Sequence, residues 1–326
     1  MEQVKMNRAD RERLVILSRV KDKQLRRREA AEVLGLSLRQ VHRLYRRYKL
    51  QGDAGLLHRG RGRASNRRVA KADRDRALKL YREHYAGSEG YAGFGPTLFA
   101  EKLGVLHGLY VSHDTVRRWM IGWGVLTEDM CRRRRSRKRR LRKSRFGEMV
   151  QMDGSDHDWF EGRCVRCVLM VMVDDATGKK LVRFYKGETV SAAMDMMNRW
   201  CQSHGVPGSL YVDRAGIYRS DRDPTLAEIK ERNKPVTQFG RAMKELDVRL
   251  ILARSPQAKG RVERANGTLQ DRLVKEMRLA KIGSMDDANI WLETGSFLKD
   301  LNARQAIGAL DPVDAHRPLV VKLSEV

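Results

Sequence analysis

Apolar positions recur at helical spacing near the start of the chain. Leu14 and Leu17 lie on one face of a predicted helix, because residues three or four apart share a helix face. A later helix is expected over residues 37–48, where Ser37 follows a glycine turn and is a natural N-cap. Short helices joined by a tight turn are typical of a helix-turn-helix, which we predict over residues 1–52.

A second helical pattern occupies residues 73–130. Pro96 stands near the first turn of one predicted helix, and Ser112 precedes another as a cap. Arg117 and Arg118 are expected on the exposed face of that last helix, where we predict that they contact DNA. A structural three-helix bundle without DNA contacts fits the same pattern, so both interpretations stay open.

The pattern becomes strand-like after residue 146. Apolar and β-branched runs alternate with turn signals there. The expected order is a strand with Asp153, strands at Val168–Val173 and Lys180–Tyr185, a helix at Val190–His204 and a strand at Ser209–Asp213. This order predicts an α/β domain with a mixed sheet over residues 147–303.

Three acidic residues stand out in this region. Asp153 lies within a predicted strand, Asp213 ends another, and Glu263 lies early in a basic amphipathic helix. The apolar stripe of that helix is Val262, Ala265, Leu269 and Leu273, with Glu263 at its edge. Carboxylates are the hard oxygen ligands that divalent cations prefer, so the three acids predict a metal site. The alternative is a chance triplet among 41 acidic residues.

Basic side chains crowd the predicted helix at residues 37–48. The positions opposite its apolar stripe are Arg39, Gln40, Arg43, Arg46 and Arg47. Arginine and glutamine read base edges and hold phosphates in the major groove, so we predict that these residues bind DNA. A basic helix face exposed only to solvent is the alternative.

Two further segments are basic and unsuited to regular structure. Residues 53–72 are a predicted linker in which Arg61 and Arg63 alternate with glycine, a composition that suits a narrow minor groove. From Arg132 to Arg145, eleven of fourteen residues are Lys or Arg, and such self-repulsion predicts a second linker over residues 131–146. Its DNA-binding candidates are Arg132, Arg133, Arg134 and Arg135. An RNA-binding or nucleoid-binding tail is the alternative for this run.

The segment Ser255-Pro256-Gln257-Ala258-Lys259-Gly260-Arg261-Val262-Glu263, together with Asp153 and Asp213, resembles the DDE transposases and retroviral-type integrases. The closest likeness is to the ISNCY group of bacterial insertion-sequence transposases, over nearly the whole chain. The resemblance implies helix-turn-helix modules followed by an RNase H-like (integrase) catalytic core.

The resemblance also implies an activity. Asp153, Asp213 and Glu263 would be the catalytic residues and the ligands of two Mg²⁺ (or Mn²⁺) ions. The reaction would be cleavage of a transposon end by hydrolysis, followed by joining of its 3′-hydroxyl to target DNA. Because two ends must be paired, a homo-oligomer on double-stranded DNA is expected. Lys259 and Arg261 could hold phosphates near the metals, or could form a solvated charged face.

Some positions depart from the family pattern. A His is expected where Asp156 stands, and a Lys-His pair where Arg214-Ala215 follow Asp213. Residues 304–326 are expected to be a C-terminal tail, shorter than the basic segment of relatives. These departures keep open a second function, that of a catalytically impaired DNA-binding remnant or regulator. A general nuclease is disfavoured because it has little need of tandem DNA-recognition modules.

Composition supports a DNA partner independently. The chain has 67 Lys and Arg against 41 Asp and Glu, a net charge of +26 and a pI near 10.4, so a polyanion is the expected ligand. With no apolar signal region and no run of about 18 apolar residues, we expect no membrane segment and a bacterial cytoplasmic, nucleoid-associated protein. The scattered cysteines, Cys131, Cys164, Cys167 and Cys201, favour reduced thiols over a zinc site.

Overall fold

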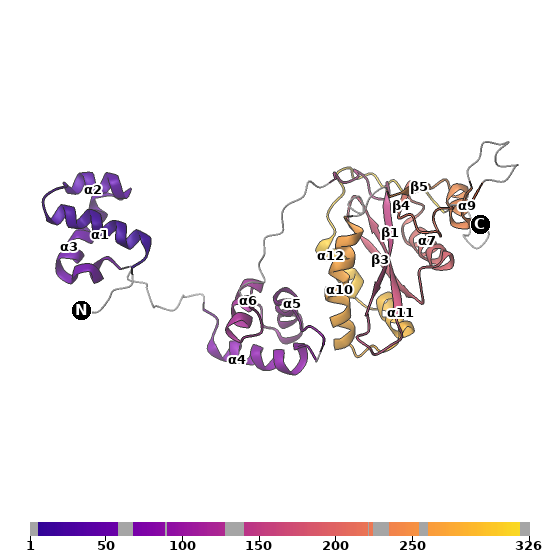
Figure 1. The fold of residues 1–326 in the computed structure, drawn as a ribbon, viewed down its shortest axis with the longest axis horizontal. Helices are drawn as coiled ribbons and strands as arrows, with labels where there is room; N and C mark the ends of the chain where they lie inside the picture. Colours follow the sequence, from indigo (N-terminus) through magenta and orange to yellow (C-terminus); the bar gives the residue numbers. More distant parts are fainter. Residues whose placement is uncertain are drawn as a thin grey trace. The chain divides into compact units, whose positions relative to one another are not determined.

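The chain forms two compact units, Met1–Ala70 and Lys71–Val326. The computed structural model describes residues 6–57, 68–88, 90–127, 140–220, 222–223, 235–253 and 260–319. Figure 1 shows their helices and strands along the sequence. Within those ranges, none of the helices is both long and apolar enough to cross a membrane.

The first unit is helical. It contains α1 (Arg8–Lys21), α2 (Arg27–Leu34), α3 (Leu38–Gln51) and the short 3₁₀ helix η1 (Gly52–Leu56). Ser37 caps α3 as predicted, because its hydroxyl accepts a hydrogen bond from the Gln40 amide at 3.3 Å. The core includes Leu17, Val41 and Leu56. Leu56, which the sequence pattern placed in a linker, is therefore part of the folded unit, because its apolar side chain fills the space between the helices.

A second helical region opens the larger unit. Helix α4 (Lys71–Leu80) continues into a π-helical turn, η2 (Tyr81–Tyr85), and is followed by α5 (Pro96–His107) and α6 (His113–Gly122). Pro96 occupies the first turn of α5 and Ser112 caps α6, both as predicted. An aromatic core of Tyr85, Phe94 and Phe99 holds the three helices together.

Ion pairs join this helical region to a later helix, α10 (Val262–Leu279). Arg272 donates two hydrogen bonds to the Glu101 carboxylate, at 2.7 and 2.8 Å. Lys102 pairs with Glu276 at 2.6 Å. The bidentate geometry of the first pair fixes its orientation as well as its distance.

The rest of the unit is built on a mixed five-stranded sheet. Its strands are β1 (Val150–His157), β2 (Cys167–Asp174), β3 (Lys180–Tyr185), β4 (Ser209–Val212) and β5 (Arg249–Leu252). The order across the sheet is β3-β2-β1-β4-β5. The β1–β2 and β2–β3 pairs are antiparallel, whereas β1–β4 and β4–β5 are parallel. A meander that leads into parallel strands linked through helices is the RNase H-like fold that we predicted.

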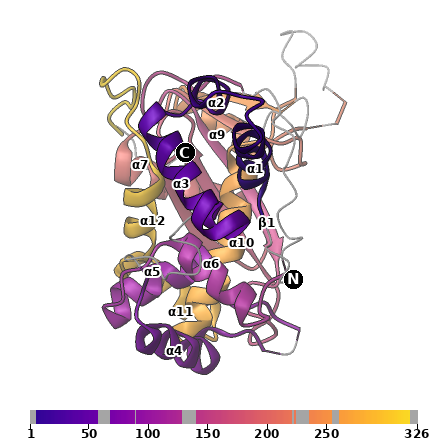
Figure 2. The same ribbon diagram turned by 90° about the vertical axis from the view of Figure 1, so that its left-hand side faces the viewer.

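Helices cover both faces of this sheet (Figures 1 and 2). Helices α7 (Val190–His204) and α9 (Gln238–Glu245) share one core with Met170 and Met172 of β2. On the other face, α10 and α11 (Met285–Thr294) share a core with Leu169 and Val171. Helix α12 (Phe297–Gln305) contributes Leu301 to that second core. Alternate residues of β2 thus serve opposite cores, which explains its unbroken apolar sequence.

Candidate active site and nucleic-acid interface

One of the predicted acids lies on β1, and a second directly follows β4, the neighbouring parallel strand. The β1–β4 register pairs Val150 with Leu210 and Gln151 with Tyr211. Asp153 lies two residues after Gln151, and Asp213 lies two residues after Tyr211. Because the side-chain period of a strand is two, both point to the same side of the sheet as Gln151. The fold therefore places side by side two acids that are sixty positions apart in the sequence.

Helix α10 runs along β1 in a fixed register. A residue of the helix contacts β1 at every fourth position, and each contact falls two residues further along the strand. Four helical residues rise about 6 Å and two strand residues about 6.6 Å, so successive contacts stay matched. The contacts are Val262 N to Gln151 Oε1 (3.2 Å), Asn266 Nδ2 to Asp153 Oδ2 (2.9 Å) and Gln270 Nε2 to Ser155 Oγ (3.1 Å).

Glu263 lies in the first turn of α10, between the first two of these contacts. Its side chain is exposed. Three residues separate it from Asn266, which shares its helix face and bonds Asp153. Within the described ranges, no group of three or more His, Cys, Asp or Glu side chains is gathered closely enough to hold a metal ion. The two aspartates are thus neighbours, and Glu263 stands near them without completing a ligand set.

Asn266 offers an oxygen that suits a cation or its bound water. The residue is only 8% exposed, and its Oδ1 is a buried atom that has no hydrogen-bond partner among the residues that the structure describes. Its amide nitrogen is held by Asp153, so the unsatisfied oxygen remains beside that carboxylate. Buried oxygens are normally satisfied, and carboxylate and amide oxygens are ligands that Mg²⁺ and Ca²⁺ accept. The residues around Asp153 therefore fit the divalent ion that the sequence implies.

Glu188 is a further acid at the site that the sequence reasoning missed. Tyr218 Oη donates a hydrogen bond to Glu188 Oε1 at 3.1 Å. Burial raises the pKa of Tyr218, and the negative charges of Glu188, Asp213 and Asp153 raise it further. A Cβ at Gly154 would collide with the Glu188 carboxylate. The glycine that directly follows Asp153 was the available signal for this close approach.

The charged sequence from Tyr218 to Pro235 predicts a surface excursion between the fourth strand and the next helix, but in the structure this segment starts inside the protein. Tyr218 is 3% exposed and stacks edge-on against Phe239, with ring centroids 5.3 Å apart. The interpretation as surface is therefore wrong for Tyr218. Residues 221 and 224–234 lie outside the described ranges.

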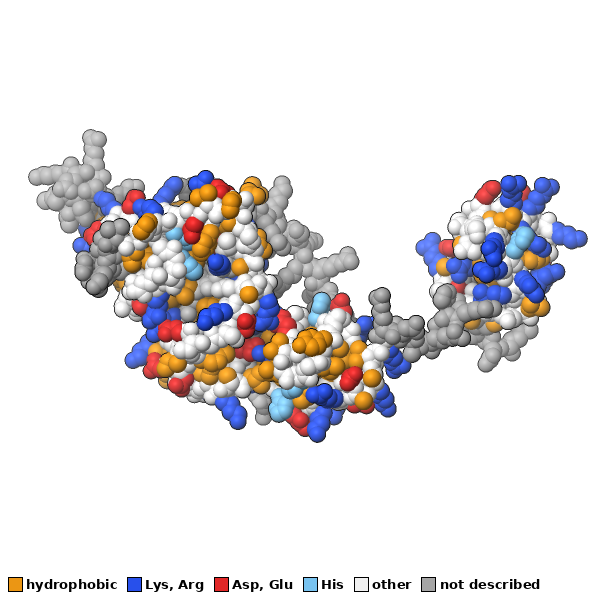
Figure 3. Space-filling view, turned by 180° about the vertical axis from the view of Figure 1, so that it is seen from behind, with side chains coloured by type: hydrophobic (Ala, Val, Ile, Leu, Met, Phe, Trp, Pro, Cys, Tyr) orange, Lys and Arg blue, Asp and Glu red, His pale blue; other side chains and the backbone are white. Residues whose placement is uncertain are grey.

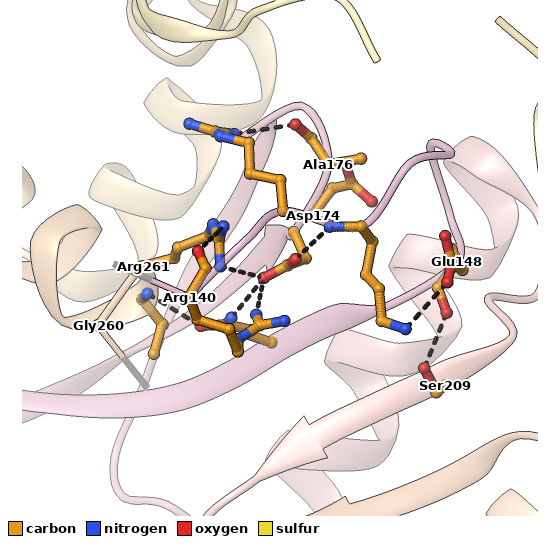
Figure 4. A network of polar contacts seen from close by, with 12 residues as sticks. Arg140, Glu148, Asp174, Ala176, Ser209, Gly260 and Arg261 are labelled. Carbon is orange, nitrogen blue, oxygen red and sulfur yellow. Dashed lines mark hydrogen bonds and ion pairs between the residues drawn. The ribbon is translucent and has the colours of Figure 1, made fainter. Parts of the chain in front are cut away.

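Arg261 has a partner within the protein. Its guanidinium donates to Asp175 Oδ1 at 2.8 Å and to the Arg140 carbonyl at 3.1 Å, and 12% of its side chain is exposed. Arg261 and Arg140 lie close together in Figure 4. The sequence had suggested a phosphate contact or a solvated face for Arg261, and the structure instead shows an ion pair with a buried carboxylate.

The predicted DNA-binding residues of α3 divide into two groups. Arg39, Arg43 and Arg46 are exposed. Gln40 is exposed as well, but its Oε1 accepts from the Ser37 amide at 3.0 Å and so also caps the helix. Arg47 is half-buried and donates to the Leu57 carbonyl at 2.7 Å, so it fastens η1 to α3. Lys and Arg side chains are spread over the visible face of this unit in Figure 3.

The remaining basic candidates are partly outside the described ranges. Arg118 is exposed on α6, whereas Arg117 is half-buried. Seven predicted DNA-binding residues lie outside the described ranges: Arg61, Arg63, Arg132, Arg133, Arg134, Arg135 and Lys259. Of the cysteines, Cys164, Cys167 and Cys201 are free thiols, and burial raises the pKa of Cys167 to about 11.

An RNase H-like sheet with adjacent acids, preceded by a helix-turn-helix unit, defines a class of DNA-processing proteins, and the comparisons with known proteins agree. The Homeodomain-like domain family matches residues 7–57. A protein of Sinorhizobium fredii that is named "Putative transposase y4bF" is 42% identical over 317 residues, which cover 97% of this chain and 66% of the relative. The transposase for insertion sequence IS1202 of Streptococcus pneumoniae is 29% identical over 314 residues. The matched region covers 86% of this chain and 65% of that relative.

The chain belongs to the DDE transposase and retroviral-type integrase superfamily. It spans about two thirds of the length of these two relatives. Among solved structures, a simian T-cell lymphotropic virus intasome matches at 19% identity and a TM-score of 0.38, covering 66% of this chain and 74% of that one. The HTLV-2 integrase catalytic core in complex with magnesium matches at 17% identity and a TM-score of 0.36, covering 53% and 98%.

Proposed function

We propose that this protein is a transposase that binds the ends of an insertion sequence, cleaves them and joins them to target DNA. The observation that carries the proposal is the placement of Asp153 beside Asp213, with the first turn of α10 fixed next to them. That turn carries Glu263. Three carboxylates from two strands and one helix would then face one phosphodiester.

Asp153, Asp213 and Glu263 would hold two Mg²⁺ or Mn²⁺ ions in this proposal. Bound in pairs, such ions activate the attacking oxygen and stabilise the leaving oxygen of an in-line displacement. The protein's own hydrogen bonds orient the carboxylates of Asp153 and Asp213. Asn266 fixes one oxygen of Asp153 through its amide nitrogen, and the Ala215 amide fixes Asp213 Oδ1 at 2.8 Å. These two hydrogen bonds orient the two carboxylates, as hydrogen bonds to metal-binding side chains generally do.

DNA recognition is assigned to the helical regions. The exposed side chains of α3 would enter the major groove, with Arg39, Arg43 and Arg46 near bases and phosphates. Arg118 on α6 would add a phosphate contact. Pairing of two transposon ends requires at least two protein copies, so the proposal includes a homo-oligomer on DNA.

A second candidate is a DNA-binding regulator without catalytic activity. It is favoured by the departures from the family pattern, Asp156 before His157 and Arg214-Ala215 after Asp213. Both candidates predict DNA binding, and they differ in whether DNA strands are cut.

Strand processing by the purified full-length chain separates the two. The protein is incubated with its element's terminal DNA and Mg²⁺, and 3′-end cleavage and joining are followed on a sequencing gel. We expect activity that is lost in Asp153→Asn, Asp213→Asn and Glu263→Gln, while DNA affinity is kept. Glu245→Gln, an exposed acid on α9, is the matched control and should stay active. Binding without cleavage by every version would support the regulator instead.

A further inference from the structure

We propose that Asp175 is a positioning residue that holds the first turn of α10, and with it Glu263, against β1. The inference rests on the proposed function for its catalytic consequence, although its structural content stands by itself. Asp175 follows the last residue of β2 and is completely buried. A buried carboxylate is costly unless it is fully paired, so its partners indicate what it holds.

Helix α10 has no side-chain cap of its own. Its N-cap residue, Arg261, has helical dihedral angles and makes no capping hydrogen bond through its side chain. The first amides of a helix need acceptors from elsewhere. The Val262 amide finds one in Gln151 Oε1, on β1, at 3.2 Å. The start of the helix is therefore capped by a residue of the sheet, two positions before Asp153.

Asp175 determines which way the Gln151 amide faces. Gln151 is fully buried, and its Nε2 donates to Asp175 Oδ1 at 2.8 Å. An ionised carboxylate only accepts hydrogen bonds, so the nitrogen must face Asp175 and the oxygen must face Val262. If the amide were reversed, Gln151 Oε1 would face the Asp175 carboxylate, and Gln151 Nε2 would face the Val262 N–H. Neither pair could form a hydrogen bond. One carboxylate thus fixes the cap of the catalytic helix.

Asp175 also holds the preceding residue of α10 directly. Arg261 donates to Asp175 Oδ1 at 2.8 Å, and Arg140 forms an ion pair with the same oxygen. The Lys143 amide donates to Asp175 Oδ2 at 2.8 Å. Figure 4 shows Arg261 and Arg140 within the polar network of this region. Two guanidinium groups balance the buried charge, and their hydrogen bonds tie the helix start to the chain segment that enters the core.

The adjacent residue, Asp174, provides a natural comparison. It is just as buried, but its partners are the Gly147 amide at 3.0 Å and the amide and hydroxyl of Thr177, both at 2.7 Å. All of these belong to turns, and none belongs to α10. Asp174 and Asp175 are therefore equally buried carboxylates, but of the two only Asp175 contacts the start of α10.

The first test measures the helix start without any metal or DNA. Hydrogen exchange of the full-length chain is followed by mass spectrometry for wild type, Asp175→Asn and Asp174→Asn. Losing one hydrogen bond at the cap should speed exchange of the amides after Gly260 by about fivefold in Asp175→Asn. Asp174→Asn should instead speed exchange around Gly147 and Thr177. Equal protection of the α10 start in both variants would overturn the proposal.

The second test measures catalysis against metal concentration. Asp175→Asn should lower strand processing and shift its Mg²⁺ dependence to higher concentration, whereas Asp174→Asn should keep the wild-type Mg²⁺ midpoint. Equal midpoint shifts in both aspartate variants would show that Asp175 serves general stability only.

The two tests also separate this proposal from the proposed function. A wild-type protein without strand processing, together with a loosened α10 start in Asp175→Asn, would refute the transposase activity and keep the positioning role. If Asp175→Asn does not fold, Arg261→Lys keeps the positive charge but loses the fork that joins Asp175 to the Arg140 carbonyl. It should show the same local exchange, and unchanged protection there would refute the positioning role.

Discussion

Glycine stands at a position of the core where any side chain would displace a buried neighbour. Gly147 has a φ of +81°, and a Cβ there would strike the His316 ring. His316 is itself held by the Trp200 indole, which donates to its Nε2 at 3.1 Å. Both the backbone conformation and the lack of space therefore require glycine at this residue.

Replacement of Gly147 by alanine should destabilise the larger unit. The positive φ alone costs about 1–3 kcal/mol, and the displaced His316 ring adds to it. Gly178→Ala is the matched control, because Gly178 has a φ of +77° but its nearest neighbouring atom would be 3.6 Å away. Thermal unfolding should show a clearly larger loss for Gly147→Ala, and equal losses would mean that the ring contact contributes nothing.

Removal of the Tyr218 hydroxyl should impair strand processing without weakening DNA binding. Tyr218→Phe leaves Glu188 Oε1 without this donor, and the loss of one such bond corresponds to about a fivefold to tenfold effect. Tyr211→Phe, on β4, removes a hydroxyl from the same unit as a control. Single-turnover cleavage rates are the measurement, and an unchanged rate would show that Glu188 does not contribute to the site.

Single residues differed in how well the sequence revealed them. Asp153 and Asp213 stood out because one lies in a strand and the other directly follows one, and apolar neighbours mark both strands; their catalytic role stays a prediction. Glu188 and Asp175 were not, because their importance depends on partners that are distant in sequence, such as Tyr218 and Arg261. Burial of a charge can be inferred from its partners only after the fold has brought them together.

Helix α3 presents both structural and exposed cations on one element. Arg43 is exposed, whereas Arg47, four residues later, bonds the Leu57 carbonyl. The sequence predicted the same role for both, since each lies opposite the apolar stripe. The pattern of a single helix could not show that the chain turns back over Arg47 through η1.

Substitution of these two arginines should have opposite consequences. Arg43→Ala should weaken DNA binding and leave the melting temperature unchanged. Arg47→Ala should lower the stability of the first unit by about 1 kcal/mol, because the backbone carbonyl of half-buried Leu57 loses its donor. Filter binding and thermal unfolding of the full-length chain measure both effects. A melting temperature that falls equally in the two variants would contradict the division.

The pH dependence of stability should reflect His204, at the end of α7. Burial lowers its pKa, and the nearby His316 and Lys179 lower it further, while Asp314 acts in the opposite direction. A depressed pKa in the fold means that stability is present above the ordinary value of about 6.5 and is lost as the pH falls through the lower folded value. Melting temperature measured from pH 8 to pH 5 should therefore decline on the acid side.

His204→Gln should flatten part of that decline, because glutamine does not titrate. His113→Gln, at an exposed position on α6, should keep the wild-type slope. Slopes are compared rather than absolute melting temperatures, since His204 also contacts the Trp200 ring, with centroids 4.9 Å apart. If melting temperature falls with pH at the same slope in wild type and both variants, His204 does not cause the decline.

The whole molecule carries far more positive than negative charge, which should dominate its encounter with DNA. The net charge is +26, and affinity that comes from phosphate neutralisation falls steeply with salt. With about six to ten phosphate contacts, binding should weaken about 10³-fold or more between 50 and 200 mM salt. Fluorescence anisotropy at several salt concentrations gives the slope, and a shallow slope would mean that few cations touch the backbone.

The register of α10 on β1 has a consequence for how this protein can tolerate change. Three side-chain contacts and one buried carboxylate tie the first three turns of the helix to β1 and to the end of β2. One residue inserted within α10 rotates everything after it by about 100° around the helix axis. Such an insertion would turn all later contacts off the strand, whereas the exposed face of the same helix can change its side chains freely.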